Sequence, residues 1–216
     1  MNRVQLPLLM TCVLLMGCVK FKPVVDQTRH FVLNPVHTST PIADRTSGRL
    51  VLGMNPVEIP DYLDSLEIVE RTGDTEVHYR TQLRWAERLK KGIQRVLVAN
   101  LDSQLGSTNA TLLAWRRNDV HAVVTVSIQR FEHQASGQAS LEARWRITEP
   151  TGGALLRNGS YSVSKPSVRL DVDPGAAVAV LGELLGDLAK QLAIELVETK
   201  HSNGLPLQAV PGSSQR

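Results

Sequence analysis

The residue with the most specific chemistry is Cys18, which closes the stretch Leu15-Met16-Gly17-Cys18. This order has the form of a bacterial lipobox, in which the cysteine thiol is alkylated with a diacylglyceryl group. The chain is then cut before the cysteine, and the new amino terminus is acylated. Burial stabilises an acyl chain in a bilayer by about 0.8 kcal/mol for each CH₂, and two or more chains give a stable anchor. The stretch predicts a protein that acylated Cys18 holds on membrane lipid, although Met16 departs from the small residues preferred at its position.

The segment before Cys18 is too short to cross a membrane comfortably. Residues 6–16 form an uncharged run of eleven residues, whereas a spanning helix needs roughly 20 apolar residues. With Arg3 ahead of it, this run predicts a signal peptide over residues 1–17. An ordinary signal peptide with an incidental cysteine is the alternative. Because Val19 and not an aspartate follows the cysteine, similarity to sorted lipoproteins favours the periplasmic face of the outer membrane.

No other residues have the spacing of a catalytic or metal site. The nucleophile-elbow and phosphate-loop motifs are absent, and Cys12 leaves with the signal peptide, so the mature chain offers no free thiol. Asp171 and Asp173 could form a carboxylate pair, but Asp173 before Pro174 is explained as a helix cap. We expect structural or solvent-facing roles for the scattered histidines: His30, His37, His78, His121, His133 and His201. We therefore predict no catalytic residue, no metal, no cofactor and no enzymatic activity.

The elements that would carry these residues alternate between short strands and two long helices. Alternation of apolar and polar residues predicts a meander over residues 120–131, 139–147 and 155–164, after shorter strands at 30–33, 49–59, 66–71 and 76–80. Apolar residues at helical spacing predict one helix over Trp85 to Leu105 and a second one after Asp173. The fold class is therefore α+β, a mixed, largely antiparallel sheet with two main helices packed on one face.

The chain length suits one domain with short tails. We predict a signal peptide at residues 1–17, a lipidated tether at 18–28, a single α+β domain at 29–199 and a disordered tail at 200–216. A net charge of +3 and an aromatic content of 4% argue against a nucleic-acid partner.

Two surface features could contact a partner. On the first predicted helix, a basic row faces away from the apolar side and could meet anionic headgroups or an acidic partner: Arg84, Arg88, Lys91 and Arg95. A solvated helix face is the alternative. On the second helix, Gly182 and Gly186 lie in a strip of small residues, and each interior glycine costs about 1 kcal/mol relative to alanine. Something must therefore pack closely here, either the domain's own sheet or first helix, or a second subunit.

Several short motifs follow one another between Val57 and Gly106. They are Pro60-Asp61-Tyr62-Leu63, Ile68-Val69 with Arg71, the stretch from Val77 to Tyr79, Leu83-x-Trp85-Ala86, and Leu97-Val98-Ala99-Asn100-Leu101. In this order they resemble the PqiC/YmbA family of ABC-type transport auxiliary lipoproteins. With the lipobox before it and the meander and helix after it, the resemblance covers nearly the whole mature chain. Arg88, where some relatives have proline, is a small departure.

The resemblance implies a function that the residues alone do not. Such lipoproteins are similar to the outer-membrane component of MCE-type systems, which move phospholipids or other hydrophobic molecules between two membranes. By this resemblance the chain would dock a periplasmic MCE-domain protein of an ABC-type transporter, as a single copy or a homo-oligomeric ring. The family supplies no catalytic residue. The alternative function is a periplasmic lipoprotein that itself binds and carries a lipid or another hydrophobic ligand.

Overall fold

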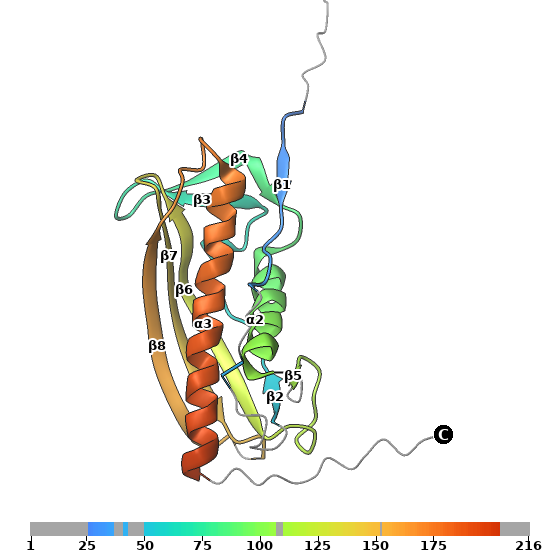
Figure 1. Ribbon diagram of the computed structural model, residues 1–216. Coiled ribbons are helices and arrows are strands. Elements are labelled where there is room, and N and C mark those ends of the chain that lie inside the picture. The colour runs from blue at the N-terminus through green and yellow to red at the C-terminus, as the bar shows by residue number, and fades with distance from the viewer. Residues whose placement is uncertain (1–25, 37–40, 43–49, 107–109, 152, 204–216) are drawn as a thin grey trace, which may run out of the picture.

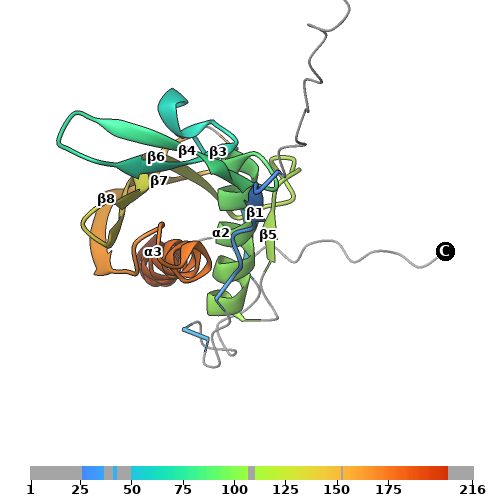
Figure 2. The same cartoon turned by 90° about the horizontal axis from the view of Figure 1, so that it is seen from above.

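A computed structural model describes residues 26–36, 41–42, 50–106, 110–151 and 153–203 of the chain. These residues form one mixed, curved sheet with two long helices on its inner side, and the sheet does not close (Figure 1). The view from above shows the sheet bending around α3 (Figure 2). Among the described helices, none combines the length and the apolar character that a membrane crossing needs.

The elements follow one another in a fixed order. They are β1 (Arg29–Phe31), β2 (Val51–Met54), the 3-10 helix η1 (Asp61–Leu63), β3 (Glu67–Arg71), β4 (Val77–Trp85), α2 (Leu89–Leu105), β5 (Ala110–Leu112), β6 (Ala122–Gln134), β7 (Gln138–Thr148), β8 (Leu155–Pro166) and α3 (Pro174–Asn203). The predicted meander is confirmed as β6, β7 and β8, and the strands predicted at 66–71 and 76–80 correspond to β3 and β4, which form an antiparallel hairpin. The α+β fold class is confirmed as well.

Strand β6 organises the sheet because it has partners along both edges. β7 pairs antiparallel with nearly its whole length, while β2 and β3 pair parallel with its first and last parts on the other edge. β1 and β5 extend the sheet through further short parallel pairs with β4 and β2. The long ladders are thus antiparallel, and the parallel ones span only two or three residue pairs each.

The core lies between the inner sheet face and the two helices. Alternate residues of β7, from Ala139 to Ile147, are buried there, as the period of two predicts. Leucines of α3 at helical spacing, such as Leu181 and Leu188, meet them from the other side. Asp173 caps α3 as predicted, because its Oδ1 accepts the backbone N–H groups of Gly175 and Ala176 at 3.0 and 3.1 Å.

The predicted start of the first helix is wrong. Trp85 ends strand β4, and α2 begins only at Leu89, after the extended backbone of Arg88. Trp85 pairs with Phe31 of β1 and donates its N–H to Leu66 O at 2.7 Å. Trp85 and Leu89 are four residues apart, which matches a helix, but these backbone contacts favour the strand. At the C-terminal end of the domain, helix α3 extends to Asn203, beyond the predicted domain limit at residue 199.

Candidate functional site

The predicted lipid attachment at Cys18 lies outside the described residues. The first described residues lie close to the N-terminal end of α3, since Gln27 lines one surface hollow together with Leu170, Val172 and Pro174. The following stretch, residues 26–36, is called here the N-terminal segment. It forms β1 and then runs along the helices.

The four cations of the basic row do not share one helix face. Arg84 belongs to β4, Arg88 precedes α2, and only Lys91 and Arg95 are helical. The prediction of one basic helix face is therefore wrong. The cause is the same as for the helix start: strand β4 continues to Trp85, and α2 begins only at Leu89. Arg84 lies 2.5 Å from Glu67 Oε1. Hydrogen bonds from Ser65 and Arg84 hold the pKa of Glu67 at about 2, far below its usual range.

The remaining members of the row differ in how they are neutralised. Arg95 forms a close ion pair with Glu87 at 2.6 Å. Arg88, by contrast, is 65% exposed at its side chain, and its contact with Asp64 is long, at 3.7 Å. Lys91 is exposed on α2, and no ion pair of it is seen among the described residues. The surface is therefore much less cationic than its sequence suggests, and its available charge is concentrated at Arg88 and Lys91.

The glycines of α3 make room for the N-terminal segment. A Cβ atom on Gly182 would lie 3.0 Å from the carbonyl oxygen of Asn34, and one on Gly186 would lie 3.3 Å from the side chain of Val36. Close packing within the chain, one of the two alternatives, agrees with this geometry. The nearest neighbour of both glycines is the N-terminal segment, however, and Asn100 of α2 lies farther from Gly186, at 3.9 Å.

Three hydrogen bonds fix the N-terminal segment in this position. Arg95 Nη2 donates to Leu33 O at 2.9 Å, and the backbone N–H of Val36 donates to Asn100 Oδ1 at 2.7 Å. Upstream, the N–H of Ala86 donates to Phe31 O at 2.9 Å. Arg95 thus has a positioning role that its place in a predicted basic row did not reveal.

A groove of about 590 Å³ remains beside the segment. Its walls come from the segment and from the first turns of α3, and they include Phe31, Val32, Val36, Val178 and Gly182. The groove is an open surface feature, and among the described residues that line it His30 and Glu183 carry an imidazole and a carboxylate. Its chemistry suits apolar contact better than catalysis.

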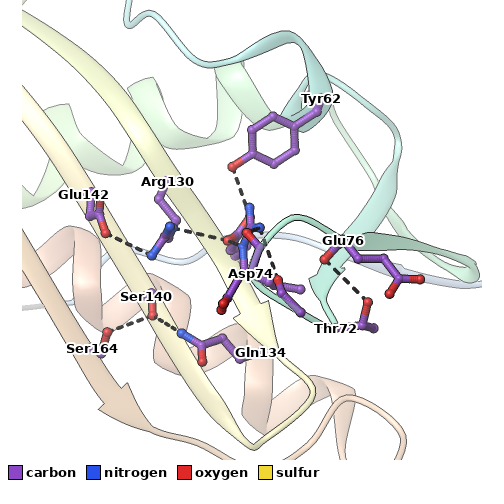
Figure 3. A network of polar contacts seen from close by, with 12 residues as sticks. Tyr62, Thr72, Asp74, Glu76, Arg130, Gln134, Ser140, Glu142 and Ser164 are labelled. Carbon is purple, nitrogen blue, oxygen red and sulfur yellow. Dashed lines mark hydrogen bonds and ion pairs between the residues drawn. The ribbon is translucent and has the colours of Figure 1, made fainter.

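A second polar cluster lies where β3 meets the far end of β6 (Figure 3). The fully buried carboxylate of Glu132 accepts hydrogen bonds from Tyr62 Oη at 3.0 Å and Arg71 Nη2 at 3.2 Å, and Arg71 Nε contacts it as well. Arg130 lies 3.4 Å from the same carboxylate and 3.0 Å from Glu142. Burial and the neighbouring carboxylate of Glu132 raise the pKa of the Tyr62 phenol, and Glu132 raises that of Arg71.

This cluster is built to hold strands together. Both carboxylate oxygens of Glu132 have cationic or hydroxyl donors, so the buried charge is compensated. The neighbouring His133 is fully buried, and burial lowers its pKa.

Sequence reasoning missed these positions as a cluster. Glu132 and His133 interrupt the apolar pattern at the end of β6, which was the only available signal. Across the described residues, no group of three or more His, Cys, Asp or Glu is placed to hold a metal ion.

Comparisons with known proteins agree with this architecture. The family described as ABC-type transport auxiliary lipoprotein component matches residues 31–193. The chain is similar to a crystal structure of an uncharacterized protein, with 20% identity and a TM-score of 0.65 over 78% of this chain and 98% of that one. It is also similar to a Xanthomonas campestris protein of the DUF330 family, with 17% identity and a TM-score of 0.67 over 82% and 99%.

At these identities the solved structures support the fold alone. The comparison with curated proteins finds no match. The family match covers residues 31–36 of the N-terminal segment, strands β2 to β8, helix α2 and α3 as far as residue 193, and it confirms the resemblance seen in the motifs. The chain belongs to the family of ABC-type transport auxiliary lipoprotein components.

Proposed function

We propose that the chain is a periplasmic lipoprotein, anchored in the outer membrane through acylated Cys18, that docks an MCE-domain protein of an ABC-type lipid transport system. The observation that carries this proposal is the family match over residues 31–193, which follows a lipobox at residues 15–18. Membership of this family makes the chain an accessory component attached to the cell envelope. The outer membrane, the MCE partner and the non-enzymatic role are the finer steps of the proposal.

The packing of the interior favours a scaffold over a lipid carrier. Large apolar side chains from the sheet and from both helices meet between the layers and are almost completely buried, among them Phe131, Leu97 and Leu188. Interiors packed in this way have no room for a guest molecule without rearrangement. We therefore rank docking above carriage, the alternative function.

The partner surface that we propose is the exposed start of α2, with Arg88 and Lys91 at its centre. The acids near these two cations already pair with other residues, Glu67 with Arg84 and Glu87 with Arg95. Asp64 makes only a long contact with Arg88, at 3.7 Å. A rim of such charges steers an acidic partner and affects the rate of association more than the stability of the fold.

Crosslinking in intact envelopes tests the docking proposal. The full lipidated chain should co-purify with an MCE-domain protein after mild crosslinking, and Arg88→Glu with Lys91→Glu should lower the yield several-fold. Arg146→Glu, on the exposed outer face of β7, is the matched control and should leave the yield unchanged. Repeated failure to recover an MCE protein, under conditions that preserve the transporter assembly, would refute the proposal.

Native mass spectrometry of the same material separates scaffold from carrier. A scaffold should be released without bound lipid beyond its own acyl chains, and its mass gives the number of copies in the assembly. A stoichiometric extracted lipid would favour the carrier instead.

A further inference from the structure

The length of the tether limits which part of the domain can reach the membrane. Seven residues lie between Cys18 and Asp26, the first described residue, and the eight Cα-to-Cα steps of this tether span at most roughly 29 Å. Helix α3 has 30 residues and is about 45 Å long. An anchor at Cys18 therefore holds one end of the elongated domain near the bilayer and leaves the other end away from it.

The near end is the N-terminal end of α3. Gln27 and Arg29 line a hollow of about 500 Å³ whose opposite wall is the turn from Leu170 to Pro174. Figure 1 shows β1 and the start of α3 at the same end of the molecule, while β5 and the end of α3 lie at the other. The exit of the tether and the 170–174 turn thus face the same side.

This end presents apolar side chains on a rigid support. Val172 is 72% exposed, more than any other large hydrophobic residue in the described part of the chain, and exposed Val168 belongs to the same connection between β8 and α3. The turn beneath Val172 is fixed, because Leu170 is buried and the N–H groups of Val172 and Asp173 both donate to Arg169 O. The exposure therefore does not come from a frayed loop.

We propose that this end of the domain faces the bilayer and that Val172, with Val168 in the same connection, inserts into the interfacial region of the membrane that holds acylated Cys18. The inference rests on the proposed anchoring. Apolar side chains are favoured at the boundary between headgroups and acyl chains. Two valines bind a bilayer weakly by themselves, but a short tether gives them a high effective concentration at its surface.

The charges at this end fit a lipid surface without a specific headgroup. Arg169 is paired with Asp171 at 2.7 Å, and Asp173 is occupied as the helix cap. Arg29 lies over the Phe31 ring at 5.3 Å from its centroid. Insertion should therefore depend little on the fraction of anionic lipid.

Site-specific fluorescence quenching tests the proposal. The mature lipidated chain has no free thiol apart from an introduced one, since Cys12 is removed and Cys18 is acylated under the proposed function. Val172→Cys and Val168→Cys would each carry an environment-sensitive dye. Leu155→Cys is the matched control, because Leu155 is 56% exposed at the start of β8, about 37 Å from Pro166 at the strand's other end. Each protein is reconstituted into phosphatidylethanolamine–phosphatidylglycerol vesicles that contain a spin-labelled phosphatidylcholine.

We expect the spin label to quench the dye at 172 and 168 at least threefold more than at 155, with similar values as the phosphatidylglycerol fraction changes. Equal or stronger quenching at 155 would overturn the orientation. Absence of quenching at 172 and 168 in protein that floats with the vesicles would overturn the membrane contact but leave the anchor intact. Loss of flotation would contradict the anchor at Cys18 and both proposals with it.

Discussion

Replacing Gly182 with leucine tests whether the glycines of α3 exist to admit the N-terminal segment. Even a Cβ atom at this position would lie 3.0 Å from Asn34 O, so the larger side chain must displace the segment. Leu33 would then lose its burial, and the hydrogen bonds with Arg95 and Asn100 would break. The perturbation begins at the segment, because both heavy atoms found within 4 Å of this Cβ position belong to the Asn34 backbone.

The magnitude follows from the lost contacts. Burial of a leucine side chain is worth about 1.5–3 kcal/mol, and each hydrogen bond about 0.5–1.5 kcal/mol. The higher helix propensity of leucine offsets less than about 1 kcal/mol. We expect Gly182→Leu to lower the free energy of unfolding by about 2–5 kcal/mol, measured by urea unfolding of the mature chain with circular dichroism.

Two alanine variants provide the control. In Gly92→Ala the new methyl group meets only the side chain of Glu87, at 3.3 Å from Oε1. A small shift of this half-exposed carboxylate relieves the contact and can keep its ion pair with Arg95, so the gain in helix propensity of about 1 kcal/mol should appear as added stability. In Gly182→Ala the contact with the Asn34 backbone should cancel that gain. If Gly182→Leu is as stable as the wild type, or if both alanine variants are stabilised equally, the close packing inferred here is wrong.

Three further perturbations test the fold around the site. Glu132→Ala leaves Arg71 without its buried partner and should cost about 3–5 kcal/mol in urea unfolding, whereas a loss below about 1 kcal/mol would show that the cluster contributes little. Burial lowers the pKa of His133 despite nearby Glu70, so the folded state takes up a proton less readily than the unfolded chain. Stability should hold above about pH 6.5 and fall as the pH drops below it; His133→Gln should flatten this fall, and an unchanged slope would contradict the assignment. Gly159→Ala would place a Cβ atom 2.5 Å from the Trp145 ring and should lower stability by about 1–3 kcal/mol in thermal unfolding. Unchanged stability would show that the ring moves aside freely and would contradict this prediction.

The regular parts of the fold could be predicted because they depend on local periodicity. Alternation from Ala139 to Ile147 marks a strand with one buried face, and the pair Asp173-Pro174 marks the start of α3. Hydrophobic burial and helix capping act over a few residues, so the sequence displays both directly. The lipobox and the order of the motifs likewise pointed to the family that the comparison confirmed.

Long-range contacts decided the rest. Trp85 fits a helical period, yet its pairing with Phe31, more than 50 residues away, places it in a strand and removes Arg84 from the helix. The basic row is therefore not a single cationic face: its residues lie in different elements, and Arg84 and Arg95 are paired with acids.

The sequence indicated that something packs closely around Gly182, because an interior glycine weakens a helix and so needs a compensating contact. Its partner was not predictable, because nothing in the local sequence relates Asn34 to Gly182. The sequence by itself determined the two helices, the meander and the chemistry expected at Cys18, all of which depend on short-range patterns. Only the tertiary structure decided which charges remain free, what fills the glycine strip and which end of α3 lies beside the tether, since these depend on residues that folding alone brings together.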